Sequence, residues 1–121
     1  MNYTKKEKME IQSVSDAFKE YIEPNPAMET MWSDKLGFIL IRTEPVAGHL
    51  NLDAEIITSA ENLCQKLVGE IGLDVFEISG RDHGLGDASK LEHDEIVRRV
   101  TPYLNQLPQY SRYLEKWIQE I

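Results

Sequence analysis

The hydrophobic positions of this chain fall into segments with helical or alternating spacing, and the longest helical segment is residues 58–78. Its apolar side chains recur at three- and four-residue steps, which places them on one face of a helix. They are Ala60, Leu63, Cys64, Leu67, Val68, Ile71, Val75 and Ile78. Thr58-Ser-Ala-Glu61 fits the capping box, in which two side chains each accept a backbone N–H at a helix start. We therefore expect a central helix over residues 58–78, and this helix should organise the core.

Two glycines allow two interpretations of where this central helix ends. Gly69 and Gly72 each cost a helix interior about 1 kcal/mol relative to alanine. Either the helix continues to residue 78, or it stops near Gly72 and residues 73–78 form a strand. Val75 and Ile78 keep the helical spacing, which favours continuation, although valine and isoleucine are also strand formers.

A shorter helical pattern precedes the centre of the chain, over residues 5–22. Its shared apolar face is made by Ile11, Val14, Phe18, Tyr21 and Ile22. Thr4 and Glu7 form a second capping box, which marks the helix start. Pro24 and Pro26 end the helix, because the residue before a proline is pushed out of the α region.

Residues 28–57 carry the patterns of strands. We expect strands at about 28–32, 37–43 and 52–57, with residues 44–49 as a loop between the last two. Asp34 and Gly37 supply turn chemistry between the first two strands, since aspartate can bond its own backbone and glycine can adopt a positive φ. Three strands with an apolar face can be stable where a lone hairpin is marginal.

The first of these segments has an alternative interpretation. Residues 26–32 could instead form a short helix, with Asn25 as its cap and Pro26 at its first position.

The C-terminal third predicts two or three further helices. Ser89-Lys-Leu-Glu92 is a third capping-box pattern, and it opens a helix through Val100. Pro102 either kinks this helix or starts a new turn capped by Thr101. Pro108 is a second break, and a last helix is expected from about residue 108. The predicted fold class is α+β: an N-terminal helix, a small antiparallel meander, then the central helix with the C-terminal helices packed on it.

Length and charge narrow the class of protein. With 121 residues the chain is expected to form one globular domain, residues 1–121. Its 21 acidic and 13 basic side chains give a net charge of −8, which disfavours nucleic acid and anionic membranes as partners. No apolar run reaches the roughly 18 residues of a membrane span, and no signal-peptide pattern is found. A single cysteine permits no internal disulfide, so we expect a cytoplasmic protein.

The loop and helix start over residues 80–95 hold the densest set of potentially reactive groups. Asp82, His83, Asp87 and His93 offer oxygen and nitrogen ligands that suit a divalent cation. Their spacing matches neither a helical zinc pair nor an EF-hand. The alternative interpretation is a surface loop whose glycines allow tight turns. We keep these four residues as weak metal candidates, and no cofactor is predicted.

No catalytic constellation stands out elsewhere. Cys64 lies on the apolar face of the central helix, where a free cysteine is commonly a small core residue. The loop glycines do not form a phosphate cradle, because Asp82 and Asp87 would place negative charge beside the phosphate. The chain also lacks the Gly-x-Ser-x-Gly pattern that would nominate a serine nucleophile.

The C-terminal aromatic residues suggest a binding surface. Tyrosine and tryptophan are enriched at interfaces because they combine apolar area with a polar group. Trp117 is expected in the core, whereas Tyr110 and Tyr113 are candidates for a partner or dimer contact. The predicted function is accordingly a non-enzymatic protein–protein interaction or regulatory module, which binds another protein or itself. Among protein partners, a basic one suits the net charge best. The alternative is a metal-binding domain or small metal-dependent enzyme that uses the Asp82–His93 segment.

Overall fold

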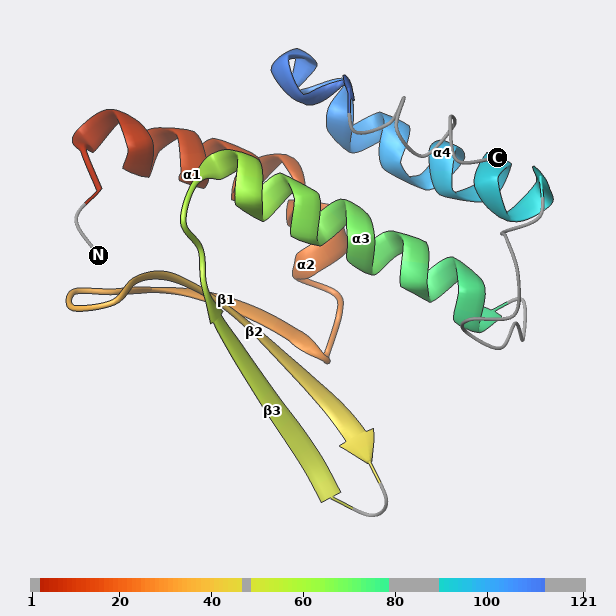
Figure 1. The fold of residues 1–121 in the computed structure, drawn as a ribbon, viewed down its shortest axis with the longest axis horizontal. Helices are drawn as coiled ribbons and strands as arrows, with labels where there is room; N and C mark the ends of the chain where they lie inside the picture. Colours follow the sequence, from red (N-terminus) through yellow and green to blue (C-terminus); the bar gives the residue numbers. More distant parts are fainter. Residues whose placement is uncertain (1–2, 47–48, 79–89, 113–121) are drawn as a thin grey trace. The chain divides into compact units, whose positions relative to one another are not determined.

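Helices and strands are segregated along the chain, as the α+β prediction requires: the three strands are consecutive and helices lie on both sides of them in the sequence. The computed structural model describes residues 3–46, 49–78 and 90–112. Within these residues the chain forms four α-helices and a three-stranded antiparallel sheet (Figure 1). The elements in order are α1 (Lys5–Ala17), α2 (Lys19–Ile22), β1 (Met28–Ser33), β2 (Gly37–Val46), β3 (His49–Ile56), α3 (Ala60–Ile78), α4 (Lys90–Leu104) and the 3-10 helix η1 (Pro108–Tyr110).

Two compact units make up the chain, and the boundary between them lies inside α3. The first unit is Met1–Leu63 and the second is Cys64–Ile121. The first therefore holds α1, α2 and the whole sheet, and the second holds most of α3 together with α4 and η1.

The first helix begins as its capping box predicts. The backbone N–H of Glu7 donates to the Thr4 hydroxyl (3.1 Å), and the Thr4 N–H donates to the Glu7 carboxylate (2.9 Å). The prediction of one helix over residues 5–22 is wrong at Phe18, where the backbone leaves the helical region (φ −94°, ψ 11°) and separates α1 from α2. Such a residue redirects the turn that follows. The Phe18 side chain is fully buried at this break.

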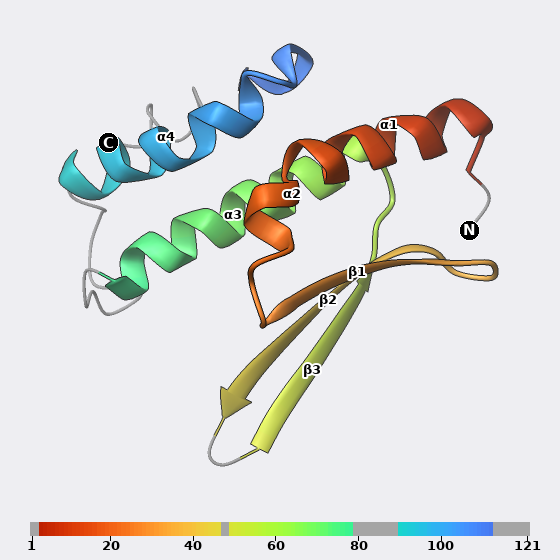
Figure 2. The ribbon, with the colours of Figure 1, turned by 180° about the vertical axis from the view of Figure 1, so that it is seen from behind.

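The sheet has the order β1-β2-β3, and both pairs are antiparallel (Figure 2). The β2–β3 ladder runs from Ile39 paired with Ile56 to Val46 paired with His49. The expected loop over residues 44–49 is therefore wrong at residues 44–46 and 49, which pair in the two strands, and residues 47–48 lie outside the described residues. The third strand correspondingly starts at His49 rather than at residue 52.

The turn between β1 and β2 depends on a glycine and on a serine. Gly37 has a φ of +92°, which confirms its predicted role. The Ser33 hydroxyl accepts the backbone N–H groups of Lys35 (3.3 Å) and Leu36 (3.1 Å), whereas the prediction assigned side-chain bonding in this turn to Asp34. Asn25 caps no helix: its side chain accepts the N–H of Ala27 (3.0 Å), one residue before β1 begins. The strand interpretation of this segment is confirmed.

The inner face of the sheet is the one that α1 covers, as Figures 1 and 2 show within the first unit. Trp32 points to this side, since its indole Nε1–H donates to the Gln12 side-chain oxygen on α1 (2.8 Å). The register places Phe38 and Leu40 on the same face as Trp32, and both are buried. The buried apolar residues of this unit are Ile11, Val14, Ala17, Phe18, Ile22, Met28, Phe38, Ile39, Leu40, Ile57, Ala60 and Leu63.

Helix α3 is continuous from Ala60 to Ile78. Residues 73–78 are therefore helical, and the favoured alternative is confirmed. The cap lies one residue later than predicted: the Ser59 hydroxyl accepts the Asn62 N–H (3.0 Å), and the Asn62 side chain accepts the Thr58 N–H (3.1 Å). The Thr58–Glu61 pairing is thus wrong, and the two cap bonds involve three residues, Thr58, Ser59 and Asn62.

In the second unit, α4 continues through the proline that was expected to interrupt it. Pro102 lies inside α4, and the Thr101 hydroxyl donates to the carbonyl of Val97 rather than capping a new turn. The buried residues Ile96, Val100 and Leu104 recur every four positions and form one stripe of this helix. Packing of α4 on the central helix stays a prediction. None of the described helices is long and apolar enough to cross a lipid bilayer.

Candidate functional site

The sheet presents a second apolar face, on the side opposite the one that carries Trp32. We call it the outer face and define it by six side chains at alternating positions of the three strands. They are Met31 of β1, Ile39 and Ile41 of β2, and Leu52, Ala54 and Ile56 of β3. Successive side chains of a strand point to opposite faces, so these residues share one surface.

The strand register aligns the outer-face residues in rows. Met31 pairs with Ile39, which pairs with Ile56, so three apolar side chains lie side by side across the sheet. In the next row Ile41 pairs with Ala54. Directly opposed side chains lie about 5 Å apart at their Cβ atoms, which is close enough to form a continuous apolar surface.

Much of this apolar surface remains in contact with water. Met31 is 48% exposed, Ile56 is 43% exposed and Leu52 is 70% exposed. In an antiparallel sheet with one buried face, the other face is ordinarily polar. A contiguous exposed apolar patch instead marks an interaction surface in many proteins. The outer face is therefore the candidate functional site of this chain.

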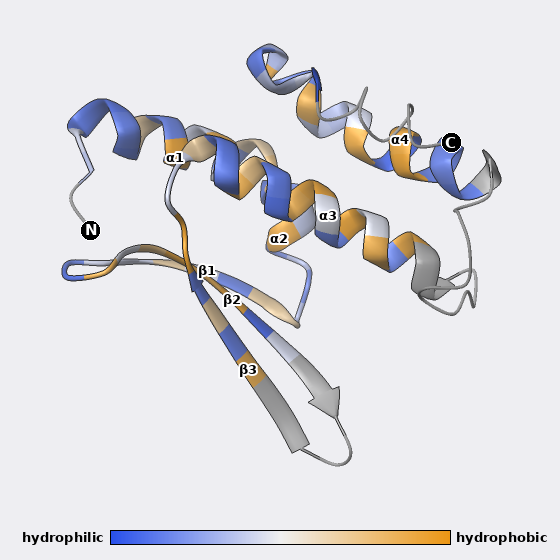
Figure 3. Cartoon of the chain, viewed as in Figure 1, coloured by the Kyte–Doolittle hydropathy of each residue, from blue (hydrophilic) through white to orange (hydrophobic). Residues whose placement is uncertain are grey.

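Charge is nearly absent from the outer face. Glu29 of β1 is its one charged side chain among residues whose exposure the structure describes. The acidic residues of β3, Asp53 and Glu55, lie on the other face of the sheet. There Arg42 bonds Asp53 (2.9 Å) and approaches Glu55 (3.5 Å). Figure 3 shows the resulting alternation of hydrophobic and hydrophilic residues along β3.

Of the four predicted metal candidates, the structure describes only His93. Asp82, His83 and Asp87 lie outside the described residues, so their grouping stays a prediction. His93 lies in the first turns of α4 and is 2% exposed. Glu92 and His93 are the buried polar side chains of the described part of the chain. Among the described residues, no three His, Cys, Asp or Glu side chains gather as metal ligands would.

Of the two predicted partner-binding tyrosines, the structure describes only Tyr110. Tyr110 lies in η1 and is half-buried, and its N–H donates to the carbonyl of Leu107 (2.9 Å). Tyr113 lies outside the described residues. The predicted inward orientation of Cys64 is confirmed, since this residue is fully buried.

Sequence reasoning did not single out the outer face, although one signal was present. The run Phe38-Ile-Leu-Ile41 is apolar at four consecutive positions of β2. A strand that alternates has one polar face, whereas a continuous apolar run supplies apolar side chains to both faces.

Comparison with known proteins places no constraint on the function. No protein-family model, curated protein or solved structure matches this chain.

Proposed function

We propose that this protein is a non-enzymatic interaction module that associates through the outer face of its sheet, and that the partner is a second copy of the chain. The observation that supports the proposal is the apolar row in which Met31 and Ile56 are exposed and Ile39, which is itself buried, lies between them. Covering such a row would remove apolar surface from water, at roughly 25 cal/mol for each Å² buried.

Charge favours a second copy over a basic partner. A basic protein would need acidic side chains on the surface that it contacts. The outer face offers Glu29 alone, whereas Asp53 and Glu55 lie on the other face beside Arg42. Two copies of a chain with a net charge of −8 repel one another in general. The repulsion between two copies is smallest where the contacting surfaces carry almost no charge, and the outer face is such a surface.

Geometry is also compatible with a symmetric pair. A twofold axis would place the Met31–Ile39–Ile56 row against the same surface of its partner, as in an isologous interface. Sheets that pack face to face lie about 10 Å apart, with their side chains interdigitated. Tyr110 and Tyr113 remain predicted contacts of the module with a partner.

The experiment measures molar mass by sedimentation equilibrium over a concentration series. We expect reversible dimerisation of the wild-type chain, and we expect Ile56→Lys to weaken it by about tenfold or more, because a lysine would be buried in an apolar interface. Leu36→Lys is the matched control: Leu36 is 48% exposed, but it lies in the β1–β2 turn. This control should dimerise as the wild type does.

Circular dichroism establishes that each variant folds. If Ile56→Lys does not fold, Leu52→Lys replaces it, because Leu52 is the more exposed residue. A wild-type chain that stays monomeric throughout the series would overturn the proposal. Equal weakening by Leu36→Lys and Ile56→Lys would overturn it as well.

A further inference from the structure

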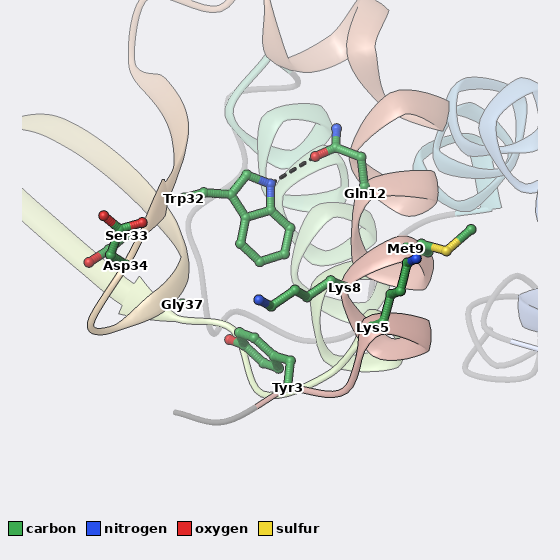
Figure 4. A pocket seen from close by; sticks show the side chains of 9 residues that line it. All are labelled: Tyr3, Lys5, Lys8, Met9, Gln12, Trp32, Ser33, Asp34 and Gly37. Carbon is green, nitrogen blue, oxygen red and sulfur yellow. Dashed lines mark hydrogen bonds between the residues drawn. The ribbon is translucent and has the colours of Figure 1, made fainter.

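A pocket of about 470 Å³ lies between the start of α1 and the β1–β2 turn, on the inner side of the sheet. It is separate from the outer face and lies within the first unit. Its lining includes the side chains of Tyr3, Trp32, Met9, Lys5 and Lys8, and the Lys5 ammonium lies beside Met9 (Figure 4). Pockets that bind small molecules have volumes of roughly 300–1,000 Å³ and combine apolar walls with a few polar groups.

The aromatic walls of this pocket are held in place from behind. The Trp32 indole N–H donates to Gln12 (2.8 Å), and the Tyr3 hydroxyl donates to the carbonyl of Ile57. The Tyr3 and Trp32 rings meet edge to face at 6.0 Å, and Trp32 meets Phe38 in the same way at 5.0 Å. The walls are therefore formed before any ligand arrives, which lowers the entropy cost of binding.

The cations come from one stripe of α1. Residues 5, 8, 9 and 12 follow the helical repeat, so Lys5 and Lys8 face the pocket together with Met9 and Gln12. The ion pair of Lys6 with Glu10 lies outside the lining, and no ion pair to Lys5 or Lys8 is found among the described residues. In Figure 4 the Lys8 ammonium reaches the space between the Trp32 and Tyr3 rings. The lining holds two lysines and one aspartate, so the pocket is net positive and favours an anion, although the chain as a whole carries a net charge of −8.

We propose that this pocket binds a carboxylate that carries an aromatic ring, with the ring against Trp32 and Tyr3 and the carboxylate beside the Lys8 ammonium. A carboxylate fits better than a phosphate. Phosphate sites at helix starts use backbone N–H groups. Here the Glu7 N–H already donates to Thr4, and the Thr4 N–H donates to Glu7. Two of the backbone N–H groups at this helix start are thus already bonded, and the charged donor beside the rings is the Lys8 ammonium. Asp34, also in the lining, lies away from Lys8 in Figure 4.

Three probes separate the ring from the charge. These are 3-phenylpropionate, 2-phenylethylamine, which keeps the ring but carries a positive charge, and acetate, which keeps the carboxylate but has no ring. The readout is the indole N–H signal of Trp32 in NMR spectra, assigned with the variant Trp117→Phe. We expect a saturable shift with 3-phenylpropionate and binding weaker by about tenfold or more for each of the other two probes.

Lys8→Gln should weaken 3-phenylpropionate binding by about tenfold. Lys6→Gln is the matched control, since it removes the same charge from the same helix outside the pocket. Absence of a saturable Trp32 shift up to about 10 mM probe would overturn the proposal. It would also be overturned if the amine bound as well as the acid, or if Lys6→Gln weakened binding as much as Lys8→Gln.

Discussion

At the scale of single residues, Gly37 connects the turn of the first hairpin to the N-terminus. Its φ of +92° is in the region that favours glycine. A β-carbon at this position would lie 2.7 Å from the Tyr3 hydroxyl oxygen and 2.8 Å from its ring carbon Cζ. Tyr3 in turn donates to Ile57 at the end of the sheet. The missing side chain of Gly37 thus allows Tyr3 to join α1 to the strands.

Replacing this glycine should therefore destabilise the fold. We expect Gly37→Ala to lower the free energy of unfolding by about 1–3 kcal/mol, because the backbone is strained for alanine and the Tyr3 ring must move. Urea unfolding followed by circular dichroism measures the change. A loss that stays the same in a Tyr3→Ala background would show that the ring clash contributes nothing.

Glu95 on α4 gives a prediction about pH. Hydrogen bonds from Arg98 first and Arg99 second lower the pKa of this carboxyl from 4.5 to about 2. A folded-state pKa below the unfolded one contributes stability that is complete above pH 4.5 and is lost as the pH falls towards 2. Because Glu95 lies at the surface, the size of the contribution is small.

The expected outcome is a pH-dependent difference between the wild type and Glu95→Gln. The wild type should be the more stable above pH 4.5, and the difference should shrink as the pH falls towards 2. Thermal unfolding at a series of pH values measures it. A difference that does not change over this range would contradict the ion-pair explanation.

At the scale of elements, α3 shows how packing overrides local weakness. Gly69 and Gly72 both lie inside the helix, which nevertheless runs over 19 residues. Leu67, Val68 and Ile71 are buried around them. Burial of a side chain of this size contributes roughly 1.5–3 kcal/mol, which exceeds the cost of a glycine in a helix interior.

Gly69 can therefore be replaced by alanine without a steric clash. Apart from its chain neighbours and the backbone of its own helix, no described atom lies within 4 Å of the position that a β-carbon would take. We expect Gly69→Ala to raise the free energy of unfolding by about 0.5–1 kcal/mol, because alanine loses less backbone entropy in a helix. Chemical denaturation measures the gain. A decrease in stability would mean that this position is crowded in solution.

At the scale of the whole molecule, the continuity of α3 bears on whether the chain is one domain. The boundary between the two compact units lies between Leu63 and Cys64, inside this helix. If the turns of α3 on one side of this boundary unfold, the hydrogen bonds that cross the boundary are lost. The remaining part of the helix then has a new end with unsatisfied backbone groups. We therefore propose that residues 1–121 unfold as one cooperative domain.

The test compares two probes of unfolding in the variant Trp117→Phe. Fluorescence of Trp32 reports on the first unit, and the helical signal in circular dichroism includes α3 and α4 of the second. We expect the two transitions to coincide in urea, as two-state unfolding requires. Separate midpoints would divide the chain into two domains.

Most elements of this protein can be predicted from local sequence patterns, because helical spacing, strand patterns and caps depend on neighbouring residues. The Thr4–Glu7 box, the positive φ of Gly37 and the strand at Met28–Ser33 follow from such local rules. Local patterns did not predict the break at Phe18, the extended pairing of β2 with β3, or the exposure of the outer face. These features depend on residues that are distant along the chain. An apolar run such as Phe38–Ile41 indicates that both sides of a strand are hydrophobic, but only the packing of α1 shows which side remains exposed.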